Sequence, residues 1–423
     1  MTKKIKVLTL SDHPMSPSGV GTQTRYMIEA LLATGEFQVY SFGGAISHDK
    51  YDASAVEGYG NDWIIQPVDG YGNKNQIREF LHRWKPDILW FMTDPRFYPW
   101  LWDMENEVRS HTPMVYYHVW DNYPAPQFNR NFYLSNDFIA TISKVTDDIV
   151  KTVAPEVESV YLPHAVSDDV FKKLDDEEIE EYKTNTLPPN AKDKFIFFWN
   201  NRNAKRKMSG SILHWFNDFL HEVGHDKAML IMHTDPKDPH GQDLQAIISH
   251  LGLSDPSHSN VLLSVEKYPP EVLAQIYNLA DCTINISDAE GFGLATLESL
   301  SCQTPIIVNM TGGLQEQVTD GENWFGIGIE PASKAIIGSQ DVPWIYEDRV
   351  AKEDFIDALK TMMNMDPEER KKMGERGRAH VEKNYSFKQF CDRWKVVMKD
   401  IHERFGSWDA RKNYNTWHLK EME

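Results

Sequence analysis

The sequence predicts an α/β protein with two domains, each built around a mostly parallel sheet. Along nearly the whole chain, short apolar runs rich in β-branched and aromatic residues alternate with longer stretches of helical composition. This alternation is typical of parallel strands joined by helices. A length of 423 residues is more than one core usually holds, and it suits two domains of about 200 residues each.

The first domain is expected over residues 1–166. It opens with an apolar strand at 5–10, and a loop containing Gly19 and Gly21 then leads into a helix, the order that begins a Rossmann-like domain. The loop lacks the third glycine of the dinucleotide fingerprint, and no acid ends the second strand, so a nicotinamide enzyme is disfavoured. The expected strands are 5–10, 37–42, 63–66, 87–91, 114–117, 137–142 and 159–162, and the expected helices are 22–33, 74–84, 98–109 and 144–153.

Residues 167–194 are acidic, include two adjacent prolines and lack a buried pattern, which predicts a linker. A second Rossmann-like domain is expected over 195–385, followed by closing helices over 386–423. Asp366 before a proline, and Ser386 three residues before a glutamine, are typical helix starts. The expected strands are 195–199, 228–232, 261–264, 282–286, one from 306 and 325–330, and the expected helices are 209–223, 242–250, 270–279 and those beginning near 294, 367 and 386.

The stretch from Glu290 to Glu298, which reads EGFGLATLE, follows a predicted strand and runs into a predicted helix. A helix N-terminus presents unpaired N–H groups and a positive dipole end, so this loop favours a phosphate. At a rise of 1.5 Å per residue, the two carboxylates lie at most roughly 12 Å apart along the axis, which could bracket a diphosphate. Two surface acids on an ordinary strand–turn–helix are the alternative.

The EGFGLATLE stretch resembles the E-x7-E signature of retaining, two-domain glycosyltransferases of the glycogen-synthase-like superfamily, often called family 4 or glycosyl transferases group 1. The resemblance implies the GT-B architecture, in which two Rossmann-like domains face each other across a cleft and C-terminal helices cross back onto the first domain. It places Glu290 beside the donor sugar and Glu298 on the ribose hydroxyls. The other donor-binding positions that it implies in this stretch are Gly291, Phe292, Gly293 and Leu294.

Four of the six residues from Arg202 to Lys207 are basic, in a chain whose net charge is −19. They follow a predicted strand and precede a predicted helix, which favours a phosphate clamp over a solvated basic face or a nucleic-acid patch. Arg202 and Lys207 fit the family's Arg-x4-Lys pattern. Their charges would offset the diphosphate leaving group. Since the chain contains no Asp-x-Asp, neither a metal nor another cofactor is expected.

Three further positions in the first domain are candidates by the same resemblance. His118 follows a strand, where the family has a histidine that contacts the donor sugar, although a lone histidine is as often structural. The loop with Gly19 and Gly21 matches the family's glycine loop, which faces the donor phosphates and the acceptor. Trp120 and Asp121 are expected on the acceptor side. These assignments place sugar transfer at the carboxyl ends of the strands, where ligands bind in open α/β sheets.

One other motif suggests a different chemistry. Residues 221–225 read HEVGH and satisfy the H-E-x-x-H zinc-hydrolase pattern, which needs both histidines on one face of an unbroken helix. Gly224 is a typical helix stop, so His225 is expected in a turn and the metal interpretation is disfavoured.

The net charge of −19 disfavours nucleic acid and anionic membrane surfaces as partners. Three widely spaced cysteines, the lack of a long apolar run and a short N-terminal apolar segment predict a reduced, cytoplasmic protein. The sequence therefore predicts a metal-independent, retaining transferase that moves a sugar from a nucleotide-sugar to a hydroxyl acceptor, either a glycan or a small molecule. A transferase acting on a modified DNA base, a GT-B nucleotide-sugar epimerase and a silent binding protein stay open as alternatives.

Overall fold

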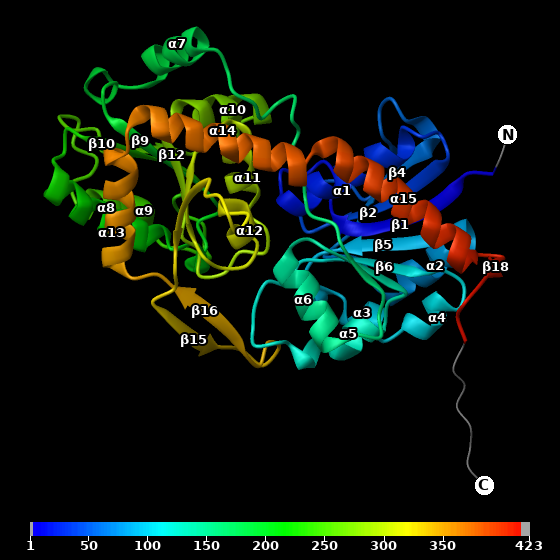
Figure 1. Ribbon diagram of the computed structural model, residues 1–423. Helices are drawn as coiled ribbons and strands as arrows, with labels where there is room; N and C mark the ends of the chain where they lie inside the picture. The colour runs from blue at the N-terminus through cyan, green and yellow to red at the C-terminus, as the bar shows by residue number, and fades with distance from the viewer. Residues whose placement is uncertain (1–2, 416–423) are drawn as a thin grey trace. The chain divides into compact units, whose positions relative to one another are not determined.

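The computed structural model describes residues 3–415, and the chain forms two compact units (Figure 1). Unit 1 contains the residues up to His164, the segment Gly338–Trp344 and the residues from Lys388 onward. Unit 2 contains Ala165–Ile337 and Ile345–Phe387. Within residues 3–415, no helix combines the length and the apolar composition needed to cross a membrane.

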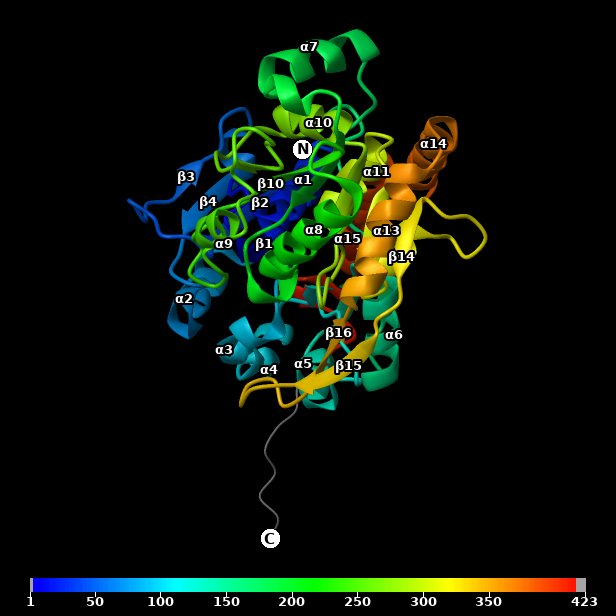
Figure 2. The same ribbon diagram turned by 90° about the vertical axis from the view of Figure 1, so that its left-hand side faces the viewer.

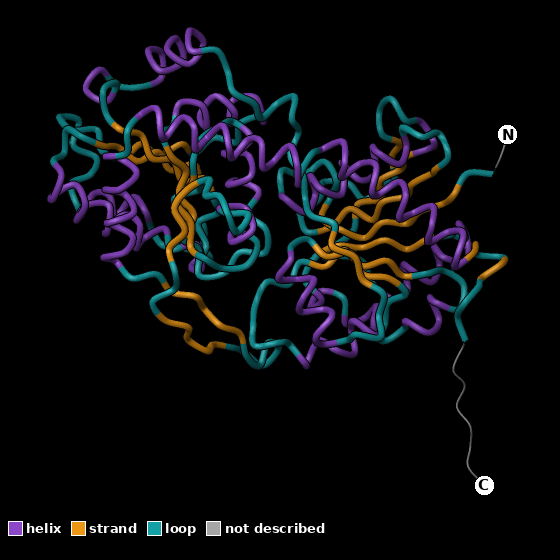
Figure 3. Tube along the Cα trace, viewed as in Figure 1, coloured by secondary structure: helices purple, strands orange, loops and turns teal. Residues whose placement is uncertain are grey.

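Unit 1 is an eight-stranded sheet in the order β3-β4-β2-β1-β5-β6-β7-β8, parallel except where β3 pairs with β4. Figure 3 shows helices flanking these strands. The seven predicted strands are confirmed, and the predicted helix 74–84 has its expected bounds. The strands are β1 (Ile5–Asp12), β2 (Phe37–Gly44), β3 (Ser54–Ala55), β4 (Trp63–Pro67), β5 (Ile88–Met92), β6 (Met114–His118), β7 (Phe138–Thr141) and β8 (Ser159–Tyr161). The helices are α1 (Gly19–Leu32), α2 (Lys74–Trp84), α3 (Pro99–Trp102), α4 (Glu105–Arg109), α5 (Arg130–Leu134), α6 (Lys144–Val153) and α15 (Phe387–Phe405).

The single helix predicted at 98–109 is wrong, because the chain forms the two short helices α3 and α4 there. The aromatic side chains of this segment take part in the core and set its path. The Tyr98 ring is fully buried, and its hydroxyl oxygen lies within hydrogen-bond distance of the carbonyl oxygens of Leu10 and Met92, both at 3.0 Å. Anchoring of this kind overrides the helical composition of the segment.

Trp394 is the largest of four buried side chains on the long helix α15, and it packs on the sheet of unit 1. Trp394 is fully buried, and its ring lies 5.8 Å from that of Trp90 and 4.9 Å from that of Tyr117, both edge-to-face. Large aromatic rings in this arrangement contribute more than their buried area alone.

Unit 2 is a six-stranded parallel sheet in the order β11-β10-β9-β12-β13-β14, with a separate antiparallel hairpin of β15 and β16. The six predicted sheet strands are confirmed, and the predicted helices 209–223 and 270–279 have their expected bounds. The strands are β9 (Phe195–Asn200), β10 (Ala228–His233), β11 (Val261–Ser264), β12 (Cys282–Asn285), β13 (Ile306–Asn309), β14 (Gly326–Ile329), β15 (Ser333–Ile337) and β16 (Ile345–Arg349). The helices are α7 (Asp176–Thr186), α8 (Ser209–Val223), α9 (Leu244–His250), α10 (Pro270–Leu279), α11 (Leu294–Ser301), α12 (Leu314–Val318), α13 (Lys352–Asn364) and α14 (Pro367–Asn384).

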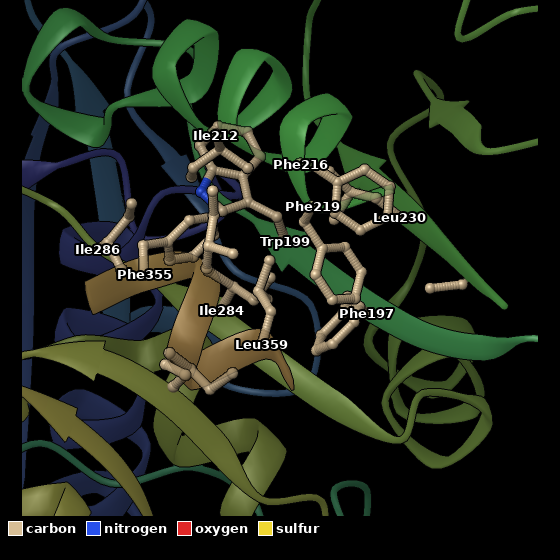
Figure 4. Close-up of a cluster of buried hydrophobic side chains, with 14 of the residues drawn as sticks. Phe197, Trp199, Ile212, Phe216, Phe219, Leu230, Ile284, Ile286, Phe355 and Leu359 are labelled. Carbon is tan, nitrogen blue, oxygen red and sulfur yellow. The ribbon is translucent and has the colours of Figure 1, made fainter. Parts of the chain in front are cut away.

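The core of unit 2 lies where β9, α8 and α13 meet (Figure 4). Phe197 and Trp199 point from β9 toward Phe216 of α8 and Phe355 of α13, and all four side chains are fully buried. The apolar and aromatic side chains of β9 thus anchor this strand in the core. The basic segment 202–207 follows the end of the same strand.

The segment expected as a linker, 167–194, is part of unit 2 and contains helix α7. No α7 side chain is buried, and the helix lies on the outside of the unit over α10 (Figures 1 and 2). Because α7 has no fully buried side chain, its sequence carries no clear amphipathic pattern from which it could have been predicted.

We expect Gly374→Ala to destabilise unit 2 by about 1–3 kcal/mol, although alanine is the better helix former. Gly374 lies inside α14, and a Cβ atom there would be 1.9 Å from the backbone oxygen of Gln303. The helix would have to move away from α11 to relieve that overlap. Urea unfolding measures the effect, and Glu375→Ala, an exposed neighbour on the same helix, is the matched control. Equal midpoints for the two variants would contradict the prediction.

Candidate functional site in unit 2

The Glu290 loop connects β12 to α11, and the neighbouring segment before and within α12 holds it in place. Gln317 donates through Nε2 to the carbonyl oxygens of Phe292 at 2.7 Å and of Gly293 at 3.2 Å. The Gly313 N–H donates to the Glu290 carbonyl oxygen at 3.0 Å. A Cβ atom on Gly313 would lie 2.7 Å from the Gly291 oxygen, so this close approach requires glycine.

Lys207 and Glu290 form an ion pair. The Lys207 ammonium donates to Glu290 Oε2, and Asn285 Nδ2 lies 3.4 Å from the same oxygen. The two side chains are only 8% and 13% exposed. The structure therefore brings together the second residue of the predicted Arg-x4-Lys clamp and the first glutamate of the predicted E-x7-E motif.

Arg206 contacts the loop that carries Glu290, although the sequence pattern did not single this arginine out. Its guanidinium donates to the Ala289 carbonyl oxygen at 2.5 Å, and its own carbonyl oxygen accepts from the Asp288 N–H at 2.8 Å. The basic segment is thus docked along the residues that precede Glu290.

The charge of Glu290 follows from these neighbours. Burial alone would raise the pKa of this carboxyl, but the charges of Lys207 and Arg206, together with the hydrogen bonds from Lys207 and Asn285, lower the pKa below its ordinary value. The carboxylate is therefore ionised at neutral pH and places a fixed negative charge beside Lys207.

The loop that carries Lys207 is itself fixed. Ser209 Oγ donates to Asn203 Oδ1 at 2.7 Å, and Asn203 Nδ2 donates to the Gln242 carbonyl oxygen at 2.7 Å. Met208 has φ +60°, in the left-handed region, and its side chain packs against the core of unit 2. A methionine with this left-handed backbone conformation is uncommon. Here the conformation turns the chain directly from Lys207 into α8.

Arg202 lies apart from the Lys207–Glu290 pair. Its side chain is 62% exposed and donates to the Asp238 carboxylate at 2.6 and 3.3 Å, with His240 Nδ1 at 2.7 Å. Hydrogen bonding from Arg202 lowers the pKa of Asp238 well below its usual range. The two predicted clamp residues thus have different partners in this structure.

Glu298, the second glutamate of the motif, has a different environment. Tyr277 donates its hydroxyl proton to Glu298 Oε2 at 2.7 Å, and Asn200 Nδ2 donates to the same tyrosine oxygen at 2.8 Å. Burial raises the pKa of Glu298 to about 7, and the hydrogen bond from Tyr277 opposes that rise. Nothing in the sequence distinguished Tyr277 from an ordinary core aromatic.

In unit 1, α1 begins at the predicted glycine loop. Ser18 caps the helix by accepting from the Gly21 N–H at 3.0 Å, and its hydroxyl donates to the Asp12 carboxylate at 2.6 Å. A Cβ atom on Gly21 would lie 2.4 Å from Ser16 Oγ, so the close approach of the loop explains this glycine. Gly19 is the first residue of α1.

His118 ends β6 and is fully buried, with Nε2 at 2.7 Å from the Tyr133 hydroxyl. Burial lowers the pKa of His118 to about 3, so the ring is neutral. Trp120 is also buried and donates from Nε1 to the Asn122 carbonyl oxygen at 2.9 Å, whereas Asp121 is partly exposed.

The HEVGH motif does not form a continuous helical face. Helix α8 ends at Val223, Gly224 has φ +107°, and His225 bonds through Nδ1 to Asn260 Oδ1 at 3.0 Å. Among residues 3–415, no group of three or more His, Cys, Asp or Glu side chains is arranged to hold a metal ion.

The fold of the chain is that of GT-B glycosyltransferases, with two Rossmann-like units. It is similar to sucrose-phosphate synthase from Thermosynechococcus elongatus, with a TM-score of 0.74 and 15% identity over 95% of this chain and 100% of that one. It is also similar to Anabaena HepE in complex with UDP and glucose, with a TM-score of 0.68 and 13% identity over 94% of this chain and 100% of that one.

Residues 188–380 match the family model for Glycosyl transferases group 1, so this stretch, most of which lies in unit 2, is a domain of that class. D-inositol 3-phosphate glycosyltransferase from Acidothermus cellulolyticus is 37% identical over 93 residues, which cover 22% of this chain and 20% of that protein. The chain thus matches about a fifth of the length of such a curated relative.

Proposed function

We propose that this protein is a glycosyltransferase that moves a sugar from a nucleoside-diphosphate sugar to a hydroxyl acceptor. The observation that carries the proposal is the buried Lys207–Glu290 pair, in which Lys207 comes from the loop before α8 and Glu290 from the glycine loop that opens α11. The group 1 domain over 188–380 supports the reaction class, and the structural neighbour in complex with UDP and glucose supports the donor class.

In the proposed reaction, the donor diphosphate lies at the Lys207 ammonium and the N-terminus of α11, through Gly291, Phe292, Gly293 and Leu294. These groups offset the charge that develops on the leaving diphosphate, so no metal ion is required. Arg202 would join them by exchanging Asp238 for a phosphate oxygen. Glu298 would accept from the ribose hydroxyls.

Transfer is proposed to retain the anomeric configuration. The acceptor oxygen bonds to the anomeric carbon on the face from which the diphosphate departs, the carbon–oxygen bond to the diphosphate breaks, and the acceptor proton passes to a leaving phosphate oxygen. Glu290, ionised and held by Lys207, stabilises positive charge on the sugar instead of forming a covalent bond. A trapped glycosyl–Glu290 adduct would contradict this mechanism.

The residues of unit 1 complete the proposal. His118, neutral because of its burial, would contact the donor sugar, and Gly19 and Gly21 would face the donor phosphates and the acceptor. Asp121 and Trp120 are proposed on the acceptor side.

The direct test is a thermal-shift screen against UDP-, GDP- and ADP-sugars. One sugar nucleotide should raise the unfolding temperature and be hydrolysed slowly without an acceptor, with release of the α-anomer from an α-linked donor. Absence of any shift would contradict the proposed donor class. Conversion of the donor to its epimer without transfer would identify an epimerase instead.

A further inference from the structure

Tyr277 of α10 is fully buried between two parts of the candidate site. Its hydroxyl oxygen lies 2.8 Å from Asn200 Nδ2 and 2.7 Å from Glu298 Oε2. Asn200 ends β9, the strand from which the basic loop leaves, and Glu298 lies in α11. Helix α10 contacts both elements. One phenol group therefore connects the start of the Lys207 loop with the second glutamate of the motif.

The direction of the two hydrogen bonds is fixed by chemistry. The Asn200 amide can only donate through Nδ2, so the tyrosine oxygen accepts from it and directs its single proton to Glu298. The Tyr277 ring cannot turn away easily, because the ring of Phe198 lies 5.0 Å from it and that of Phe171 6.1 Å, both edge-to-face. Tyr277 is thus an oriented donor to one carboxylate oxygen.

This arrangement leaves the two oxygens of Glu298 in different roles. Oε2 is engaged by Tyr277, and within residues 3–415 the Glu298 side chain makes no second hydrogen bond. A carboxylate held through one oxygen can present the other to a ligand hydroxyl with little loss of side-chain entropy on binding.

We infer that Tyr277 is a positioning residue for donor binding, which holds Glu298 so that its second oxygen accepts from the ribose hydroxyls of the nucleoside diphosphate. This inference rests on the proposed function. Tyr277 itself touches no reacting atom, so its removal should weaken donor binding much more than it slows turnover.

A second consequence concerns protonation. Burial raises the pKa of Glu298 to about 7, and the Tyr277 hydroxyl opposes that rise. Another titratable group near Glu298 is Cys302, the residue after α11. Burial and the charge of Glu298 raise the pKa of Cys302, while the charges of Arg378 on α14 and of Lys173 lower it. Loss of the phenol proton donor should therefore raise the pKa of Glu298 further.

The sign of the pH effect follows. Glu298 accepts from ribose hydroxyls best when it is ionised, so donor affinity in the wild type should fall as the pH drops below about 7. In Tyr277→Phe the same fall should begin at a higher pH, because the Glu298 carboxyl would stay protonated up to a higher pH. A residue that only filled space would not move this profile.

The test is calorimetric titration of the wild type and Tyr277→Phe with UDP, GDP and ADP from pH 6 to pH 9, combined with donor-hydrolysis kinetics. We expect a rise of about tenfold in the Kd and KM at pH 7, a kcat within about threefold, and a shift of the affinity profile to higher pH. Tyr182→Phe, a partly buried tyrosine on α7, is the matched control and should leave all of these values unchanged.

The outcomes are distinguishable. If the wild type binds none of the three nucleotides, the proposed function fails. If the wild type binds one of them and Tyr277→Phe gives the same affinity and pH profile, the positioning role fails. Should Tyr277→Phe not fold, Asn200→Ala removes the donor that orients the phenol and should shift the profile in the same direction by less; an unchanged profile there would also overturn the role.

Discussion

Replacing Lys207 by alanine should lower kcat/KM for donor cleavage by about 10² or more, because the ammonium stabilises charge on the departing diphosphate. The loss has a second component. Lys207 is the foremost of the groups that lower the pKa of Glu290, so without it burial will raise that pKa. The acid limb of the activity profile should therefore move to higher pH. Steady-state hydrolysis of the best sugar nucleotide, measured against pH, checks both effects.

Lys205→Ala is the matched control for this variant. Lys205 carries the same charge, lies two residues away and is exposed. The control should change kcat/KM by less than about threefold, because an exposed charge in water is well screened. Equal losses in the two variants would mean that the loop acts through its total charge and that Lys207 has no special position.

Glu290→Gln should lower kcat by about 10²–10³ while UDP, GDP or ADP binding is kept or strengthened. The amide has nearly the shape of the carboxylate but cannot balance positive charge on the sugar. It also releases the Lys207 ammonium from its ion pair, which leaves that charge available to the diphosphate. Nucleotide affinity by calorimetry and single-turnover hydrolysis measure the two effects separately. Glu322→Gln, an exposed acid elsewhere in unit 2, is the control.

The two variants should not be additive. Because Lys207 and Glu290 share one ion pair, the double variant should lose less activity than the product of the single losses. Strict additivity would show that the side chains act independently, and weakened nucleotide binding in Glu290→Gln would place this acid on the nucleotide instead of the sugar.

Most of the strand positions could be predicted because the buried strands form short apolar runs that stop at polar residues. Helices with one apolar face, such as Lys74–Trp84 and Ser209–Val223, were predicted with their observed bounds. The helices that were missed or given wrong bounds lack such a local pattern. Helix α7 buries no side chain, and the aromatic residues of 98–109 follow core contacts that no local pattern records.

Some of the candidate residues that lie together in the structure could be indicated from the sequence. The glycine loop and the spacing of the basic residues indicated Glu290 and Lys207, and the structure pairs them. Spacing could not show that Arg202 faces Asp238 while Arg206 reaches the Glu290 loop, since that depends on how the loop turns after β9. Tyr277 could not be identified either, because the sequence does not distinguish a tyrosine in an apolar helix from an ordinary core residue.

The left-handed backbone of Met208 has a consequence for the proposed binding of a nucleotide. An L-amino acid at φ +60° costs about 1–2 kcal/mol of backbone energy, which the contacts of its side chain with the apolar interior offset. The loop proposed to hold the diphosphate therefore has a fixed backbone, and nucleotide binding would not have to order a flexible glycine at this position. Association should involve little ordering of the protein, so the heat capacity change on binding should be small.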